Sequence, residues 1–376
     1  MADPTVERLQ AEVIDGLKRR FVGRDEVVDL IALAVVAGEH LFLYGPPGTA
    51  KSALIRQFAA SVRGRYFEYL LTRFSEPNEI FGPIDLARLR EGAVATVTTG
   101  MLPEAEFAFL DELFNANSAI LNNLLTVLNE RVYRRGAEVH RLPLLSLFSA
   151  SNHLAEDEAL GALFDRFLLR CHVDQLGRDA MPRLLAAGWA LERSEPGRPS
   201  VSAADLRALS ARVHEVDLSA VTGPYAEVLF KVRDLGVAIS DRRAVKILKL
   251  LAASAILSGR DAANPSDLWV LRYVWDRVEQ VDPLASLVNG VLDRHRDEPR
   301  RHPLASVPEV VDAEDVARQL DALEAGLEGG RAPTLAALAG AREHAAALGD
   351  RAAWVASADD RRRLLDRVAR LLETLG

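Results

Sequence analysis

Residues 45–52 read Gly45-Pro46-Pro47-Gly48-Thr49-Ala50-Lys51-Ser52, between an apolar run that ends at Tyr44 and an apolar helical stretch that starts at Ala53. Glycines at both ends of such a loop let the backbone turn with positive φ, so that successive N–H groups face phosphate oxygens. A strand before the loop and a helix behind it complete the pattern of a phosphate-binding P-loop. A plain glycine turn is disfavoured, because chance gives this pattern in only about one chain in a hundred of this size.

The loop residues have separate expected roles. Lys51 would reach the β- and γ-phosphates, and the Ser52 hydroxyl would bind Mg²⁺. The N-terminus of the following helix adds its dipole. The predicted nucleotide-binding set in this part of the chain is Gly45, Pro46, Pro47, Gly48, Thr49, Ala50, Lys51, Ser52 and Ala53.

Composition limits the class of protein. The chain has 376 residues, of which 49% are hydrophobic and 27% charged, and is long enough for two or three domains. It has no stretch of about 20 apolar residues and no basic, then apolar, leader at Met1, so we expect a cytoplasmic protein without a membrane span. A single cysteine, Cys171, excludes an internal disulfide. The net charge of −8 argues against generic nucleic-acid binding.

ATP hydrolysis also needs carboxylates, one for the Mg²⁺ shell and one to orient or deprotonate the attacking water. Asp111 and Glu112 supply both, directly after the apolar run Phe107 to Leu110. Alone this pattern also fits a solvated acidic turn, but behind a P-loop it indicates a catalytic pair. Asn152, after the next apolar run, is placed to align water and γ-phosphate, although a strand-closing turn would also use asparagine.

Phosphoryl transfer is further helped by a cation that neutralises charge on the phosphoryl oxygens. Arg166 is the first candidate for this arginine finger, but its neighbour Asp165 makes a surface ion pair an equal alternative. Arg170 is the next candidate. Arg242, at the start of a predicted helix, could reach back from a helical domain to the γ-phosphate, with the adjacent Arg243 as its alternative.

Strand and helix patterns alternate through residues 1–195, which predicts an α/β core with a parallel, doubly wound sheet. In such sheets ligands lie beyond the carboxyl ends of the strands, where the P-loop, Asp111 and Asn152 fall. Residues 94–99 alternate like an exposed hairpin. Strands are expected at 40–44, 66–70, 107–110, 144–151 and 170–173, with helices at 1–20, 25–37, 85–89 and 118–130.

A Pro- and Gly-containing linker at 195–199 marks the end of the core, and strand patterns vanish after it. We expect an all-helical lid domain at 196–283 and a helical C-terminal domain, a possible partner-binding part, at 284–376. The lid helices are expected at 202–216, 224–235, 241–257 and 266–280, and the C-terminal helices at 315–327, 334–348 and 359–375.

The motifs, in this order, resemble Walker A, Walker B, sensor 1, arginine finger and sensor 2 of AAA+ ATPases. They are carried by Gly45 to Ser52, Phe109 to Glu112, Ser151-Asn152, Asp165-Arg166 and Ser240-Asp241-Arg242. The chain resembles the MoxR family, and within it the RavA branch, over about residues 8–280. The narrower resemblance lies in Thr72 to Ser75, Phe81 to Pro83, Gly100 to Glu106, Leu121 to Leu125 and Asn129 to Arg131. The sensor-2 triplet of this chain is Ser-Asp-Arg, whereas many family members have Ser-Pro-Arg.

The resemblance implies further properties. Val22 and Gly23 would lie near the adenine, and copies of the chain would form a ring, usually of six, with ATP and Mg²⁺ at subunit boundaries. Each site would take Arg166 from its neighbour. The segment from Gly92 to Gly100 would face the ring pore. Relatives of this type usually work with von Willebrand factor A domain proteins as chaperone-like remodelers that mature a partner complex.

Three functions are compatible with these patterns. The first is a ring-forming ATPase that remodels a protein. The second is a nucleotide-gated scaffold that hydrolyses ATP slowly and recruits partners through its C-terminal helices. The third, a DNA-associated motor, is disfavoured by the acidic net charge.

Overall fold

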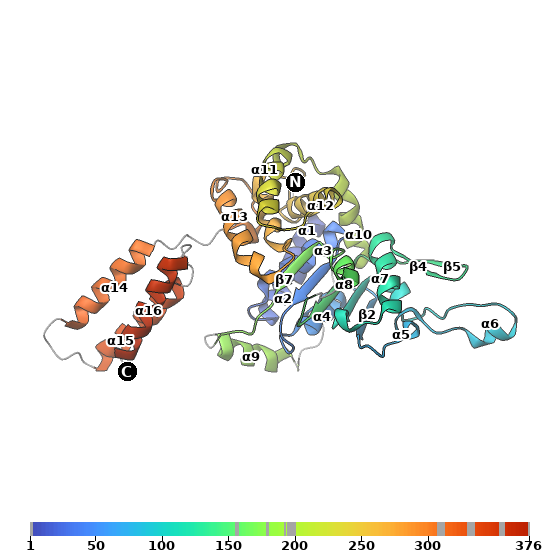
Figure 1. Ribbon diagram of the computed structural model, residues 1–376, viewed down its shortest axis with the longest axis horizontal. Helices are drawn as coiled ribbons and strands as arrows, with labels where there is room; N and C mark the ends of the chain where they lie inside the picture. The colour runs from blue at the N-terminus through green and yellow to red at the C-terminus, as the bar shows by residue number, and fades with distance from the viewer. Residues whose placement is uncertain are drawn as a thin grey trace. The chain divides into compact units, whose positions relative to one another are not determined.

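The computed structural model describes residues 3–154, 158–177, 180–191, 193, 201–306, 313–328, 335–352 and 358–374. Contacts divide the chain into two compact units, Met1–Ala305 and Ser306–Gly376 (Figure 1). The first unit therefore extends past residue 284, where we expected the C-terminal domain to begin. The division of this unit into a core and a lid at residue 195 stays a prediction.

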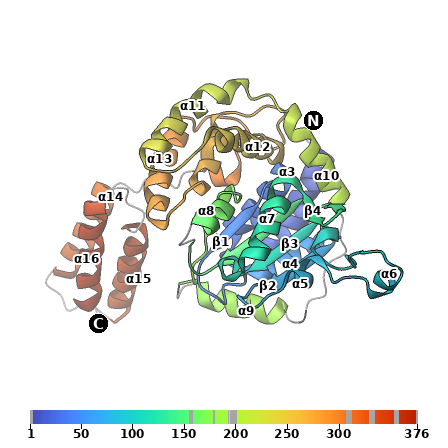
Figure 2. The ribbon, with the colours of Figure 1, turned by 45° about the vertical axis from the view of Figure 1, so that its right-hand side comes forward.

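A five-stranded parallel sheet forms the centre of the first unit, as predicted, in the order β2-β3-β6-β1-β7. The connections from β1 to β2 and from β3 to β6 cross the sheet in opposite directions. Right-handed crossovers therefore place α4 (Lys51–Ser61) and α7 (Ser118–Glu130) on opposite faces (Figure 2). The strands are β1 Leu41–Tyr44, β2 Tyr66–Leu70, β3 Phe107–Asp111, β6 Ser146–Ser151 and β7 Leu169–His172.

The N-terminal helices come before the first strand of the sheet. Helix α3 (Asp25–Ala37) is buried nearly all round, as its run of apolar residues predicts, and ends at Gly38 with φ of 65°. The predicted helix before it is present, but its middle is a π-helical segment, so it is divided into α1 Pro4–Arg8, η1 Leu9–Ile14 and α2 Asp15–Arg20.

The predicted hairpin at 94–99 is wrong. This segment makes a single antiparallel bridge, from Thr96 to Ile84, at the base of a projecting arm (residues 82–100) that carries α6 (Leu86–Arg90; Figure 1). The hairpin of this region is instead formed by β4 (Val132–Arg135) and β5 (Glu138–Arg141). Short helices flank these parts: α5 Pro77–Phe81, η2 Leu102–Glu104 and η3 Leu113–Asn115.

The chain after the sheet is helical, as predicted. One helix differs: the stretch 266–280 forms the 3₁₀ segments η6 and η7, and a regular α-helix starts only at Val281. Helices α10 and α12 pack against α3, which joins this helical part to the sheet. The elements are α8 Glu158–Phe164, α9 Met181–Leu191, α10 Ala203–Ala211, η5 Arg212–Glu215, α11 Ser219–Asp234, α12 Asp241–Leu257, η6 Pro265–Tyr273, η7 Val278–Gln280, α13 Val281–Asp293 and η8 Pro303–Ala305.

The described residues of the second unit form three helices, α14 (Ala313–Glu328), α15 (Leu335–Ala352) and α16 (Ala358–Thr374), as predicted. Apolar side chains from all three form a core of their own, made of Val316, Leu320, Ala345, Leu348, Ala352, Leu364, Val368 and Leu371. Among the described residues, no helix combines the length and apolar character needed to cross a membrane.

Candidate functional site

The loop from β1 to α4 has the backbone that the P-loop pattern predicts. Gly45 (φ 150°) and Gly48 (φ 78°) both adopt positive φ. A Cβ on Gly45 would lie 2.1 Å from the carbonyl oxygen of Val173, so the close approach of these two segments requires glycine. Ala50, at the N-cap of α4, also has positive φ (64°), which is costly for a residue with a side chain.

Lys51 folds back over this loop. Its Nζ donates hydrogen bonds to the carbonyl oxygens of Gly45 (2.9 Å) and Pro46 (2.8 Å). Burial lowers the pKa of Lys51, and Asp111 and Glu112 oppose that effect. An ammonium group is therefore held among the loop carbonyls, close enough to both carboxylates to be affected by their charge.

The carboxylates lie at the end of β3, between β2 and β6. Asp111 Oδ1 accepts a hydrogen bond from the Glu112 backbone N–H (3.0 Å). Burial raises the pKa of Asp111, while Lys51 draws it down. Glu112 has φ of 52° and accepts a hydrogen bond from Ser151 Oγ at 3.5 Å.

The donor set fits Mg²⁺. This ion usually takes one or two carboxylates and fills its shell with water and substrate phosphates. Among the residues that the structure describes, the Ser52 hydroxyl and Asp111 Oδ2 have no side-chain hydrogen bond, and no group of three or more His, Cys, Asp or Glu could hold a metal by itself. A metal at Ser52 and Asp111 would thus need the nucleotide to complete its shell.

Asn152 follows β6, which lies directly beside β1. It lines an open cavity of about 400 Å³ with Gly45, Pro46 and Pro47. Its Oδ1 lies 2.8 Å from Nδ1 of His153. The structure therefore brings Asn152 to the P-loop, as the sequence predicts.

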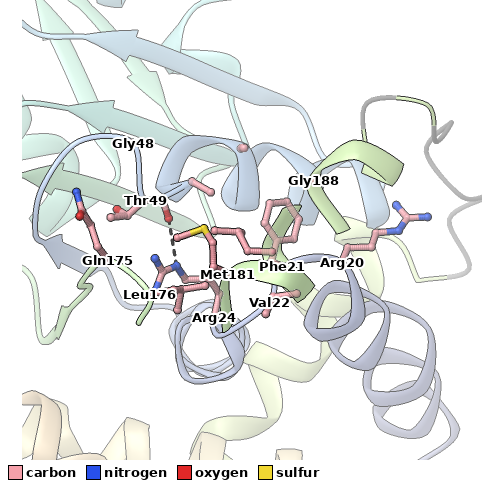
Figure 3. A pocket seen from close by; sticks show the side chains of 13 residues that line it. Arg20, Phe21, Val22, Arg24, Gly48, Thr49, Gln175, Leu176, Met181 and Gly188 are labelled. Atoms are coloured by element: carbon pink, nitrogen blue, oxygen red, sulfur yellow. Dashed lines mark hydrogen bonds between the residues drawn. The ribbon is translucent and has the colours of Figure 1, made fainter. Parts of the chain in front are cut away.

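A second cavity, of about 310 Å³, is lined by the later P-loop residues Gly48, Thr49 and Ala50 (Figure 3). Its walls combine the N-terminal segment, the P-loop and α9, and most of its side chains are apolar, which suits a flat base. Five of the predicted nucleotide-binding residues line it: Val22, Gly48, Thr49, Ala50 and Ala53. Gly23 packs against Leu176, whose Cδ2 would be 2.5 Å from a Cβ at that position.

The sequence did not reveal the rest of this cavity. Arg24 donates from Nε to the Thr49 carbonyl (3.2 Å) and from Nη2 to the Asp174 carbonyl (2.8 Å), so it joins the P-loop to the segment before α9 (Figure 3). In the sequence, the only signal for Arg24 was its position directly after Gly23. Other residues of the cavity that sequence reasoning missed are Arg20, Phe21, Gln175, Leu176, Met181, Leu184 and Gly188.

The predicted arginines do not lie at this edge of the sheet. Arg166 precedes β7, whose first residue, Leu169, pairs with the first residue of β1, whereas the P-loop follows the last residue of β1. Arg166 and Arg242 line one small cavity with Lys246, which also binds Glu39, just before β1. The two arginines thus lie together at the amino edge of the sheet.

This placement corrects two earlier expectations. Arg242 was expected to reach back to the γ-phosphate of its own chain, but it lies exposed beside Arg166, at the edge opposite the P-loop. Arg170, the second finger candidate, is only 1% exposed and is bonded inside the chain. Arg243 is likewise buried, which leaves Arg242 as the accessible arginine of its pair. The expected Asp165–Arg166 ion pair is present at 3.5 Å.

The sequence of the core matches a family described as the MoxR domain in the MoxR-vWA-beta-propeller ternary systems, over residues 7–211. The match spans more than half of the chain. The chain belongs to the MoxR family of AAA+ ATPases. A second match, to an AAA lid domain, covers residues 226–288, from within α11 to within α13, in agreement with the helical part seen here.

Other MoxR-like sequences extend the comparison. An uncharacterized protein of Methanocaldococcus jannaschii is 36% identical over 289 residues, 76% of this chain and 75% of that protein. The chaperone MoxR1 of Mycobacterium tuberculosis is 29% identical over 174 residues, 45% of this chain and 44% of its own. A crystal structure of a candidate ATPase from Cytophaga hutchinsonii has the same fold, with a TM-score of 0.62 at 18% identity over 77% of this chain and 94% of that one.

Proposed function

We propose that this MoxR-family chain is a Mg²⁺-dependent ATPase whose copies assemble into a six-membered ring and use ATP hydrolysis to remodel a partner protein complex. The observation that carries the proposal is the division of the site between two edges of one sheet. Lys51, the acidic pair and Asn152 surround the P-loop at the carboxyl edge, while Arg166 and Arg242 lie at the amino edge.

The chain's own residues divide the work at the carboxyl edge. Lys51 exchanges its carbonyl partners for phosphate oxygens when ATP binds, because a charged acceptor makes the stronger hydrogen bond. Ser52 and Asp111 would hold Mg²⁺, which neutralises phosphate charge when bound. Glu112 and Asn152 orient the attacking water, and the cavity beside Val22 takes the adenine.

A neighbouring copy would complete the site. The transition state needs a cation that approaches the γ-phosphate from outside the P-loop. Of the described residues, two arginines line the cavities beside the P-loop: Arg24, which is bonded to backbone carbonyls, and Arg20, which lies at the end of its cavity away from Thr49 (Figure 3). We assign this role to Arg166 and Arg242 of the adjacent copy. Arg242 is exposed and Arg166 partly exposed at the amino edge, which supports an approach in trans.

The family description supports a choice of partner. The matching family is named for systems that combine MoxR, vWA and beta-propeller parts, and we therefore propose a von Willebrand factor A domain protein as a partner. The RavA-like branch, the pore-facing role of the arm and the cytoplasmic location remain predictions of the sequence.

Two variants test the proposal. Lys51→Ala should lose ATP binding, because the variant lacks the ammonium group that binds the loop carbonyls and would bind the phosphates. Glu112→Gln should bind ATP and hardly hydrolyse it, since a neutral amide cannot take a proton from water. Binding is measured with a fluorescent ATP analogue and turnover as released phosphate.

Glu112→Gln also separates the proposal from its rival, a nucleotide-gated scaffold, which the separate three-helix unit at 306–376 favours. If Glu112→Gln retains the ability to remodel a partner, hydrolysis is not the working step and the scaffold function holds. Full turnover in Glu112→Gln would place the catalytic carboxylate elsewhere.

A further inference from the structure

At the amino edge, the exposed Arg242 and the partly exposed Arg166 are each followed closely in the chain by a buried arginine. Arg170 stands four residues after Arg166, and Arg243 directly follows Arg242. Arg170 is 1% exposed and Arg243 3% exposed. Buried guanidinium groups need a hydrogen-bond acceptor for most of their donors, so the partners of these two residues show what they hold in place.

Arg170 fixes the turn that carries Arg166. Its Nε donates to the Phe167 carbonyl (3.1 Å) and its Nη2 to the Phe164 carbonyl (3.0 Å). The guanidinium carbon also lies 3.9 Å from the centre of the Phe164 ring. These contacts bind the backbone on both sides of Arg166, so the direction in which that side chain leaves the surface depends on Arg170.

Arg243 does the same for Arg242. Its backbone N–H is capped by Ser240 Oγ (3.2 Å), which fixes the first turn of α12. Its guanidinium donates to the carbonyl oxygens of Ala238 (3.0 Å) and Val274 (2.6 Å). The first turn of α12, where Arg242 lies, is thereby held against the loop before it and the end of η6.

One carboxylate joins the two buried arginines. Asp276 Oδ1 accepts hydrogen bonds from Arg170 Nη1 and from Arg243 Nη1, the latter at 2.7 Å. Its Oδ2 accepts the backbone N–H of Ala238 at 2.6 Å. Asp276 therefore connects β7, which follows the Arg166 turn, with α12, whose first turn contains Arg242.

We propose that Asp276 is a positioning residue for ATP hydrolysis in the adjacent copy: through Arg170 and Arg243 it sets the distance and direction between the two arginines that this copy presents to its neighbour. The proposal rests on the proposed function and adds the residue that makes Arg166 and Arg242 act as one pair. Asp276 itself touches no nucleotide.

The electrostatics explain why a carboxylate is needed at this point. Burial and repulsion from Arg243 lower the pKa of Arg170 to about 9, although Asp276 opposes both effects. Burial alone would raise the pKa of Asp276, but Arg243 and Arg170 together hold it below its usual value. Without the shared anion, the two cations would repel each other inside the protein and move apart.

A second ionic contact keeps α12 in place without involving Asp276. Glu39, just before β1, is 3% exposed at its side chain and binds Lys246 (3.1 Å) and Lys249 (3.0 Å) of α12. Removal of Asp276 should therefore leave α12 docked on the sheet while its first turn loosens. The expected defect is local to the arginine pair.

The test is subunit complementation with Asp276→Asn, which has nearly the same shape but no charge. Alone, the variant should keep its affinity for a fluorescent ADP analogue and its Michaelis constant for ATP within about threefold, while its turnover falls about 100-fold, the cost of a misplacement near 1 Å. Mixed one to one with Glu112→Gln, whose arginines are intact, it should recover about a quarter of wild-type turnover, because one boundary in about four then pairs an intact site with an intact arginine pair.

Two further measurements decide the interpretation. Arg166→Ala mixed with Glu112→Gln must recover activity in the same way; if it does not, the proposed function fails, whatever Asp276 does. Asp267→Asn serves as the matched control. It neutralises a buried carboxylate of the same helical part, which is bonded to Arg260 and Ser254 and not to Arg170 or Arg243. It should retain turnover at a temperature where it is folded.

The inference is overturned if Asp276→Asn keeps wild-type turnover, if it fails to complement while Arg166→Ala succeeds, or if Asp267→Asn shows the same loss. Should Asp276→Asn not fold, Arg243→Lys replaces it. Lysine keeps the charge but cannot bond Ala238, Val274 and Asp276 in the same planar arrangement, so the same recoverable loss is expected.

Discussion

Lys51 and Arg166 are both cations that the proposed reaction uses, yet their surroundings differ. Lys51 is held by carbonyl oxygens of the loop that we propose binds phosphate, so under that proposal it serves binding as well as turnover. Arg166 is 25% exposed at its side chain and forms an ion pair with Asp165. A residue with this exposure can change partners when a neighbouring copy approaches.

Arg166→Ala should therefore leave nucleotide binding nearly unchanged and lower turnover by about 10³-fold or more, as expected for an arginine finger. Phosphate release and binding of a fluorescent nucleotide measure the two effects. Arg294→Ala, on an exposed residue at the end of α13, is the control and should behave like the wild type. Equal turnover in Arg166→Ala would remove this residue from the mechanism.

Asp29 gives a pH prediction at the same scale. It is 2% exposed in α3, and Lys18 lies 2.7 Å from its Oδ1. Burial raises the pKa of Asp29 to about 6, although Lys18 opposes the rise. The unfolded chain releases this proton near pH 4, so the folded state binds more protons between these values and loses stability as pH rises through 6.

The free energy of unfolding should fall by about 1 kcal/mol more in the wild type than in Asp29→Asn when pH rises from 5 to 7. Urea unfolding at the two pH values measures this difference. Parallel changes in both proteins would show that Asp29 does not titrate in this range.

The residues of the site differ in how readily they can be predicted. Lys51, Asp111 and Glu112 are found from sequence because the loop and the strand end set their positions locally. The base cavity is different: Leu176 and Met181 meet the segment around Val22 only after the sheet has formed. Arg242 was assigned to its own nucleotide because a helix start is visible in the sequence, whereas the sheet edge that it faces is not.

Among the elements, the arm and the β4–β5 hairpin are joined by hydrogen bonds. Glu138 of β5 accepts hydrogen bonds from Thr96 Oγ1 (2.7 Å) and from the Thr96 backbone N–H (3.3 Å). Arg135 of β4 donates to the Gly82 carbonyl at 3.1 Å. The base of the arm is thus held by side chains of the hairpin as well as by its own bridge between Thr96 and Ile84.

Glu138→Ala should raise the amide hydrogen-exchange rate of residues 84–97 about tenfold, because two hydrogen bonds at the base of the arm are lost. Exchange measured by mass spectrometry tests this, and P-loop peptides should not change. Glu91→Ala, on an exposed residue of the arm, is the matched control. No change at 84–97 in Glu138→Ala would mean that the hairpin does not restrain the arm.

Elements with a strong apolar period were predicted to within a residue or two, among them helices 25–37, 118–130 and 241–257. The 3₁₀ segment η6 was taken for an α-helix because both place residues i and i+3 on one side. The hairpin was assigned to 94–99 because β-branched residues alternate there, although a ribbon also needs a partner strand. The turn at Gly136, with φ of 57°, between β4 and β5 was the signal that was overlooked.

For the whole molecule, the division at residue 305 makes a direct prediction. Every residue assigned to the ATP site lies in the first unit, and the second unit has a core of its own. A chain that ends at Ala305 should hydrolyse ATP at a rate within about twofold of the full chain, since no contact of the site is removed. Loss of turnover on truncation would show that the three C-terminal helices belong to the catalytic machinery.

The separation of phosphate loop and arginine pair onto opposite edges of one short sheet also limits how copies can associate. A two-fold dimer buries the same patch on both partners, so it could join a phosphate loop to an arginine pair only if that one patch reached both edges of the sheet. A head-to-tail contact instead joins the carboxyl edge of one copy to the amino edge of the next. If the arginines act in trans as proposed, an assembly of such contacts has a polarity, and an open row of copies leaves one terminal pocket without its arginines.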